Sequence, residues 1–109
     1  MQEIKINKIE DKRGFSIFLE GLPIKKFHIV SVNPGAIRGD HSHDYEEILC
    51  IIGGNEIAEI TLEDSKKSCT FIIKEKYTLL TIPPHTKHKV RNVGNKVFYL
   101  ICFSGKEFE

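Results

Sequence analysis

Short stretches of this chain are rich in β-branched and aromatic residues, and several alternate between apolar and polar positions. No stretch carries the 3.6-residue repeat of an amphipathic helix. Turn-forming combinations separate the stretches, among them Asn33-Pro34-Gly35, Gly53-Gly54-Asn55 and Gly94-Asn95. The pattern predicts strands at 3–9, 15–20, 26–32, 46–52, 56–62, 68–74, 77–82, 87–93 and 96–103. We expect an all-β sandwich, jelly roll or small barrel, because these folds leave few exposed sheet edges.

The length and charge of the chain limit the number of domains and the classes of binding partner that we expect. A chain of 109 residues can bury one hydrophobic core, so we expect residues 1–109 to form a single domain. Sixteen Lys and Arg residues balance fifteen Asp and Glu residues, which leaves a net charge of +1 with neither sign concentrated in one half. Binding to nucleic acid or to an anionic membrane through bulk charge is therefore not expected.

The apolar stretches indicate where the protein resides and how its cysteines are used. None is long enough to cross a bilayer, and the first residues do not resemble a signal peptide, so we expect a cytoplasmic protein. Cys50, Cys69 and Cys102 lie in apolar stretches without the spacing of a metal site or a disulfide framework. We expect all three to be small core residues.

One polar cluster is the main candidate for chemistry. His41, His43 and Glu47 are separated by even numbers of residues, so in an extended strand their side chains share a face. Later in the chain, Pro83-Pro84 form a rigid turn before a predicted strand that contains His88, which a neighbouring strand could bring beside the other three. Three imidazoles and a carboxylate suit divalent Fe, Mn, Co, Ni, Cu or Zn, and the ligand types alone do not select among these metals.

The same residues resemble the two motifs of the cupin superfamily, G-x5-H-x-H-x3,4-E-x6-G and G-x5-P-x-G-x2-H-x3-N. The matching positions are Gly35, His41, His43, Glu47 and Gly54 in the first motif, and Pro83, His88 and Asn92 in the second. The resemblance implies a cupin double-stranded β-helix, a jelly-roll barrel, whose metal ligands are His41, His43, Glu47 and His88. Many cupins keep the barrel without a metal, and there the same histidines are ordinary pocket residues.

Two positions depart from the second motif, where Tyr77 replaces the first glycine and His85 replaces the internal glycine. The family often has positive φ at the internal glycine, a conformation that other residues adopt at some cost. His85 is therefore either an exposed loop residue or a residue at the pocket rim that contacts substrate or metal. His28, on the preceding predicted strand, is a further candidate for substrate contact, or a core or surface residue.

A second resemblance is to the dTDP-sugar branch of the cupins, which includes dehydrorhamnose 3,5-epimerases and ketohexose 3,4-ketoisomerases. Its D-x-R-G and R-G-x-H-x-H signatures resemble residues 11–14 and 38–43 of this chain. The resemblance implies that Arg38 binds a sugar or diphosphate, since its planar fork suits oxyanions, with an exposed loop cation as the alternative. The ketoisomerases typically carry histidine near position 47 and a longer tyrosine-rich tail, and this chain has neither.

In the dTDP-sugar branch, unmetallated histidines transfer a proton at a carbon beside a ketone. By resemblance, the base in this chain would be His41 or His43. The assisting phenol would come from Tyr45, Tyr77 or Tyr99, unless these tyrosines only pack in the strands.

The two resemblances give competing functions, because a histidine that gives its lone pair to a metal cannot also take up a substrate proton. With a metal, we expect an isomerase or epimerase acting on a small carbohydrate-like or oxygenated substrate, or an Fe(II) dioxygenase. Without one, we expect a sugar-nucleotide ketoisomerase that uses histidine acid-base chemistry. A non-enzymatic protein that binds a small molecule is the remaining alternative. Related small cupins pair or exchange an N-terminal strand, so the resemblance also implies a homodimer.

Overall fold

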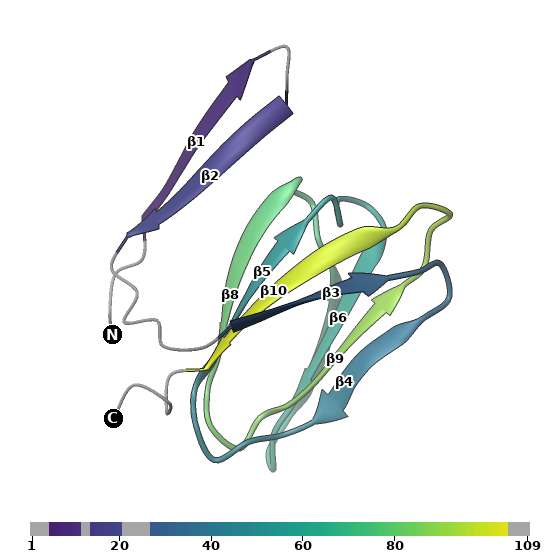
Figure 1. The fold of residues 1–109 in the computed structure, drawn as a ribbon. Helices are drawn as coiled ribbons and strands as arrows, with labels where there is room; N and C mark the ends of the chain where they lie inside the picture. The colour runs from purple at the N-terminus through teal and green to yellow at the C-terminus, as the bar shows by residue number, and fades with distance from the viewer. Residues whose placement is uncertain (1–4, 12–13, 21–26, 105–109) are drawn as a thin grey trace.

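The computed structural model describes residues 5–11, 14–20 and 27–104, and the side chains of residues 29–103. Every element of regular structure in this part of the chain is a β-strand (Figure 1). The strands are β1 (Lys5–Asp11), β2 (Gly14–Glu20), β3 (Phe27–Val32), β4 (Ile37–His41), β5 (Glu47–Ile52), β6 (Ala58–Glu63), β7 (Ser68–Ile72), β8 (Tyr77–Ile82), β9 (Lys87–Asn92) and β10 (Phe98–Ser104). The described residues contain no helix with the length and apolar character that crossing a membrane requires.

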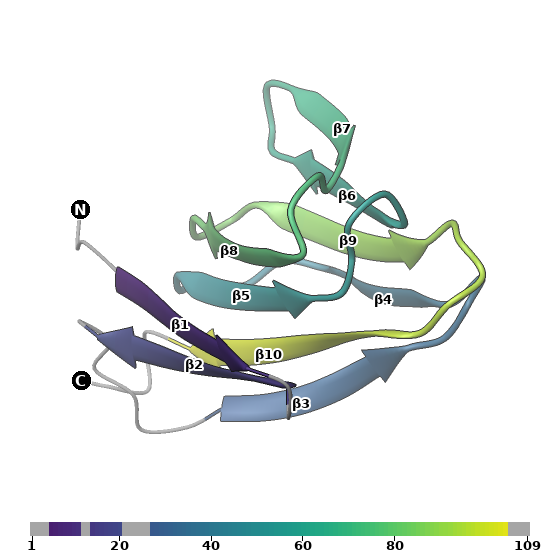
Figure 2. The same cartoon turned by 90° about the horizontal axis from the view of Figure 1, so that it is seen from above.

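Two four-stranded sheets face each other, with strand orders β3-β10-β5-β8 and β4-β9-β6-β7 (Figure 2). All the strand pairs are antiparallel. Strands that are distant in sequence lie side by side, as β4 does with β9 and β3 with β10. This arrangement confirms the predicted all-β jelly roll. β1 and β2 form a separate two-stranded sheet, which pairs with neither of the other sheets in the part of the chain that is described.

Strand β4 is absent from the sequence-based prediction, which has no strand between residues 33 and 45. All five of its residues are exposed, so it lacks the apolar positions that mark a strand facing a core. It forms because its backbone pairs with β9, and the partners include Ile37 with Arg91 and Arg38 with Val90. A polar edge strand of this kind is specified by its neighbour more than by its own sequence.

The core lies between the two sheets and extends past one of them. Leu49 and Ile51 of β5 are buried between the sheets, together with residues such as Ile60 and Phe98. The alternate β5 residues Ile48 and Cys50 are also buried, in a second cluster with Phe103 on the other face of the same sheet. Burial on both faces explains why β5 is an almost continuous apolar run.

The buried amide of Asn92 joins the end of β9 to two neighbouring segments. Its Nδ2 donates to the carbonyl oxygens of Val32, at 2.9 Å, and Lys96, at 2.6 Å. Its Oδ1 accepts a hydrogen bond of 2.9 Å from the Gly94 N–H. The motif asparagine thus holds together the end of β3 and the β9–β10 turn, and its hydrogen bond to Val32 is buried inside the fold, where water cannot replace it.

Candidate metal and substrate site

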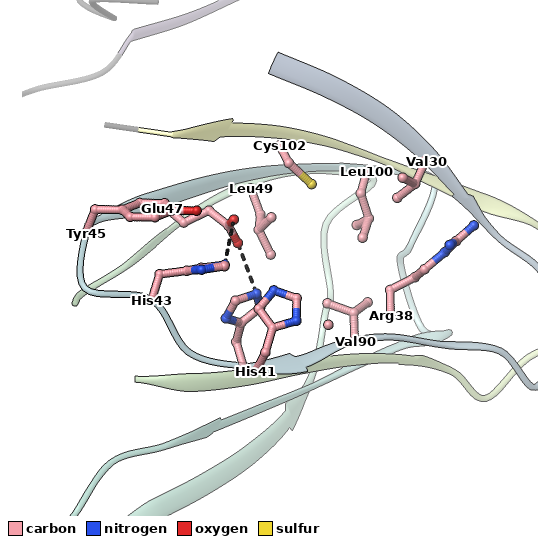
Figure 3. Close-up of a pocket in the computed structure, with 12 residues that line it drawn as sticks. Val30, Arg38, His41, His43, Tyr45, Glu47, Leu49, Val90, Leu100 and Cys102 are labelled. Atoms are coloured by element: carbon pink, nitrogen blue, oxygen red, sulfur yellow. Dashed lines mark ion pairs between the residues drawn. The ribbon is translucent and has the colours of Figure 1, made fainter. Parts of the chain in front are cut away.

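A cavity of about 320 Å³ opens between the two sheets (Figure 3). One part of its wall is polar and contains His41, His43, Tyr45, Glu47 and His88. The rest is formed by Val30, Arg38, Gly39, Leu49, Val90, Leu100 and Cys102. The cavity therefore combines a compact group of nitrogen and oxygen donors with a largely aliphatic chamber, as small-molecule sites commonly do.

His41 and His88 meet because β4 and β9 are neighbours. The two residues are direct partners in the antiparallel register, and their ring centroids are 4.8 Å apart. A register shift lies between Gly39 and His41, and Asp40 between them has a left-handed backbone with φ of 68°. This bulge breaks the alternation of side chains, so Arg38 and His41 both line the cavity although they are three positions apart.

His43 and Glu47 reach the cluster from the connection to the other sheet. His43 lies in the loop after β4, and Glu47 is the first residue of β5. The Glu47 carboxylate lies between two imidazoles, with Oε1 3.0 Å from Nε2 of His88 and Oε2 3.5 Å from Nε2 of His43 (Figure 3). A single buried carboxylate thus contacts His43, in the loop between β4 and β5, and His88, on β9.

The structure therefore brings together all four residues that the sequence analysis identified as metal ligands. We refer to His41, His43, Glu47 and His88 as the tetrad. The ligand atoms of its three histidines all lie within 4.8 Å of one another. Nε2 of His43 and Nδ1 of His88 are buried without a hydrogen-bond partner among the described residues, and the His43 contact with Glu47 is an ion-pair distance only. A buried nitrogen atom without a partner, such as Nε2 of His43, is what a coordinating cation would satisfy.

The charge states of the tetrad favour a cation. Burial by itself would raise the pKa of Glu47, but the hydrogen bond from His88 and the nearby imidazoles outweigh it, so the pKa lies below its usual value. Burial lowers the pKa of His43, and the opposing effect of the Glu47 charge is smaller than the combined effect of burial and the other two histidines. Near neutral pH the site therefore presents a carboxylate and a neutral His43, the forms that bind metal ions.

Tyr45 is the aromatic residue closest to this chemistry. Its ring stacks on His43 with a centroid separation of 4.6 Å and an interplanar angle of 16°, and it lines the cavity. Tyr99, which the sequence analysis grouped with Tyr45, is not brought to the site. It is 47% exposed, and its neighbour Leu100 is the residue of β10 that faces the cavity.

The candidate substrate contacts differ in their placement. Arg38 lines the cavity, and its Nε and Nη2 both donate to the carbonyl oxygen of Ser31, at 3.0 and 2.9 Å. His85 is exposed and is not part of the cavity wall. The side chain of His28 lies outside the described side chains. Tyr77, the remaining phenol candidate, is half-buried in β8 and does not line the cavity.

The predictions from sequence did not include the aliphatic part of the cavity wall or the position of Cys102 in that wall. Leu100 and Cys102 alternate along β10 with Tyr99 and Ile101, so the period-two pattern itself held the signal that this strand has one cavity face. Burial raises the pKa of the Cys102 thiol to about 12, with a further contribution from the charge of Glu47. The thiol is therefore a neutral wall group at neutral pH, without the reactivity of a thiolate.

Comparison with known proteins shows the family of this chain and the relatives of its fold. Residues 9–109 match the family described as the polysaccharide biosynthesis C-terminal domain. No curated protein sequence gives a significant match.

Many solved structures share the fold, among them the following three. The sugar 3,4-ketoisomerase QdtA from Thermoanaerobacterium thermosaccharolyticum, in complex with TDP, has a TM-score of 0.71 and 21% identity over 93% of this chain and 77% of its own. A 3,4-ketoisomerase from Helicobacter canadensis has a TM-score of 0.67 and 24% identity over 94% of this chain and 84% of its own. The capsular polysaccharide assembling protein CapF from Staphylococcus aureus has a TM-score of 0.64 and 18% identity over 92% of this chain, which spans 28% of CapF. At these identities the likeness shows the fold, and it confirms the predicted cupin jelly roll.

Proposed function

This chain belongs to the polysaccharide biosynthesis C-terminal domain family, and from that premise we propose that it is a metal-dependent isomerase or epimerase of a carbohydrate-like substrate. The observation that carries the proposal is the convergence of the tetrad at one end of an otherwise aliphatic cavity. The likeness of the fold to two sugar 3,4-ketoisomerases supports the reaction class.

The residues of the tetrad fit a divalent metal ion. Imidazole and carboxylate donors suit divalent Fe, Mn, Co, Ni, Cu and Zn, and the buried Nε2 of His43, which lacks a hydrogen-bond partner among the described residues, supports such an ion. When bound, the ion would act as a Lewis acid on a carbonyl oxygen of the substrate. Glu47 would offset part of its charge, and the three histidines would supply neutral ligands.

The remaining wall residues would bind the substrate and transfer protons. Among the described residues that line the cavity, the titratable groups outside the tetrad are Tyr45, Arg38 and Cys102. Arginine side chains do not give up a proton in proteins, and burial raises the pKa of the Cys102 thiol to about 12, so the Tyr45 phenol is the group suited to carry a proton. Leu49, Leu100 and the other aliphatic side chains exclude water from the reacting carbon.

Metal analysis tests the proposal directly. Protein purified without a histidine tag and incubated with Fe(II), Mn(II), Ni(II) or Zn(II) should hold close to one ion per chain, and the His88→Ala variant should lose it. His85→Gly is the matched control, because it removes a histidine that lies outside the cavity and should keep the metal. If the wild-type protein takes up none of these ions, the metal-dependent proposal is wrong.

The alternative that would then remain is a metal-free sugar-nucleotide ketoisomerase. It is supported by the ketoisomerase likeness and by the neutral, partly buried His43, which stacks on Tyr45 and could serve as a base. His41 or His43 would take the proton, and Tyr45 would assist. In that case activity should persist in the presence of a strong chelator and be lost in His43→Ala.

Substrate class is tested by a thermal-shift screen with dTDP-, UDP- and GDP-sugars. Ligands that stabilise the protein are then incubated with it in D₂O, and deuterium at a carbon beside the carbonyl is measured by NMR. Incorporation supports isomerase or epimerase chemistry. Binding without incorporation supports a non-enzymatic binding protein, and oxygen uptake with another substrate supports an Fe(II) dioxygenase.

A further inference from the structure

Three residues with left-handed backbone lie where residues 39–47, which include His41, His43 and Glu47, meet residues 85–88, which include His88. Gly39 and Asp40, with φ of 85° and 68°, directly precede His41. His85, with φ of 63°, lies in the turn that leads into β9 and His88. For Asp40 and His85 this conformation is unfavourable, so the surrounding structure must maintain it.

Each of the three residues makes a contact between residues 39–47 and residues 85–88. The His85 N–H donates a hydrogen bond of 2.7 Å to the carbonyl oxygen of His43. Gly39 packs so closely on His88 that a Cβ atom would lie 2.9 Å from its carbonyl oxygen and 3.2 Å from Cδ2 of its ring. The Asp40 carboxylate lies 3.4 Å from Nζ of Lys87, but both side chains are about half exposed, so this ion pair is weak.

These backbone contacts orient the histidine rings, which in metal sites is usually done by a hydrogen bond from the second ring nitrogen. A histidine ligand normally donates its second ring nitrogen to a carboxylate or carbonyl group, which fixes the orientation of the ring. Nδ1 of His88 has no such partner in the described part of the chain. The orientation of the ring therefore depends on its packing against the Gly39 backbone and the His41 ring and on its contact with Glu47.

We propose that Gly39, Asp40 and His85 form a backbone clasp that positions the histidines of the tetrad. The inference rests on the proposed function, because the positioned groups are the proposed metal ligands. The clasp residues are positioning residues: the His85 N–H holds the His43 loop, the Asp40 bulge turns His41 into the cavity, and Gly39 lets the β4 backbone approach His88. The imidazole of His85 has no part in the clasp.

A matched pair of substitutions separates the backbone of His85 from its imidazole. His85→Gly and His85→Val both remove the imidazole and keep the N–H, but glycine adopts positive φ readily and the β-branched valine strongly resists it. Glu56 supplies the control, because it is exposed and has φ of 68°. Its N–H donates a hydrogen bond of 2.8 Å to the carbonyl oxygen of Ile73. Glu56 lies beyond the last residue of β5, whereas Glu47 of the tetrad is the first residue of that strand. Glu56→Val imposes the same kind of strain at a distance from the site.

The readouts are the absorption spectrum and affinity of bound Co(II), and the imidazole ¹H–¹⁵N signals of the metal-free protein. We expect His85→Val to bind Co(II) about 10-fold more weakly or worse, with a changed spectrum and shifted ring signals, as for lost support behind a metal ligand. His85→Gly and Glu56→Val should match the wild type in the Co(II) spectrum, the Co(II) affinity and the ring signals of the tetrad histidines. Equal loss in His85→Gly and His85→Val, or wild-type behaviour in His85→Val, would overturn the clasp. If wild type binds no Co(II), the proposed function fails, and the ring signals of the metal-free variants still test the clasp.

Discussion

The side chain of Glu47 contacts both His43 and His88, and it does so from a buried position. Its carboxylate is within 3.0 Å of His88 and 3.5 Å of His43. A buried carboxylate among imidazoles is stable only with a partner cation or with hydrogen bonds to the ring nitrogens. The charge of Glu47, more than its shape, should therefore determine how strongly the site binds a metal.

Glu47→Gln tests this role at nearly constant volume. The amide keeps one oxygen donor but loses the negative charge, so we expect metal affinity to fall by more than the roughly 10–100-fold that removal of a supporting residue costs. Isothermal titration with Zn(II) or Co(II) measures the change. Glu46→Gln is the matched control, because Glu46 is the adjacent exposed carboxylate and should leave affinity unchanged. A Glu47→Gln protein with wild-type affinity would exclude Glu47 as a ligand.

The cysteines show how little a local apolar stretch says about burial. Cys50 and Cys102 are buried, as expected, but the expectation that Cys69 is a core residue is wrong, since it is exposed. It lies on β7, the edge strand of its sheet. In the middle of a sheet the same sequence pattern would have been covered by a neighbour.

Thiol labelling should separate the three cysteines. Burial raises the pKa of Cys50 and raises that of Cys102 to about 12, and both thiols are shielded from solvent, so we expect only Cys69 to react rapidly with Ellman's reagent at pH 8. Unfolding in guanidinium should expose the other two. Cys69→Ser should abolish the rapid phase, and a rapid phase that survives this substitution would show that the cavity thiol is accessible.

At the scale of strands and turns, the sequence predicted which four side chains converge, but for an incomplete reason. Even spacing placed His41, His43 and Glu47 on one face of a single extended strand. In the structure His41 ends β4 in one sheet, His43 lies in a loop, and Glu47 begins β5 in the other sheet. The side chains converge because the chain crosses between sheets, and spacing along one strand does not encode such a crossing.

The bulge before His41 was equally inaccessible to a sequence argument. Strict alternation would place Arg38 and His41 on opposite faces of β4, yet both line the cavity. The left-handed conformations of Gly39 and Asp40 account for the difference. Gly-Asp is compatible with many turn and bulge conformations, so only the pairing of β4 with β9 selects this one.

The amide of Asn92 gives a prediction about the turns that hold these strands. Asn92→Ala removes three hydrogen bonds and leaves the Val32 carbonyl without its side-chain partner inside the fold. We expect the free energy of unfolding to fall by about 2–3 kcal/mol. Urea unfolding followed by circular dichroism measures it, with Asn95→Ala at an exposed position of the same turn as the control. Equal effects of the two substitutions would contradict a structural role for the Asn92 amide.

For the molecule as a whole, the two cupin motifs were more informative than any single strand. Their residues lie on β4, β5 and β9 and in the adjoining turns, and the antiparallel register sets His41 directly opposite His88. The paired motifs thus predicted a contact between residues far apart in sequence, which strand patterns alone do not provide. The single-domain organisation of residues 1–109 remains a prediction, although the family match extends from residue 9 to residue 109.

The outer face of the β3-β10-β5-β8 sheet bears on the expected homodimer. Part of it is covered, since Ile48, Cys50 and Phe103 are buried there. On the same sheet Ile29 is 61% exposed and Tyr99 is 47% exposed. A covered apolar cluster that continues into exposed large side chains is typical of a surface that binds another protein. The proposed partner is a second copy of this chain.

Light scattering coupled to size-exclusion chromatography tests the dimer. We expect wild-type protein to have twice the 12.5 kDa mass of one chain at micromolar concentrations, and the Ile29→Lys/Tyr99→Lys double variant to be monomeric. Two buried lysine charges without partners cost several kcal/mol at an interface, enough to shift a micromolar dimer to monomer. Phe71→Lys is the control, because Phe71 is 37% exposed on the edge strand of the other sheet and should leave the mass unchanged. A monomeric wild type would contradict the dimer, and a dimer that survives the double substitution would place the interface on a different surface.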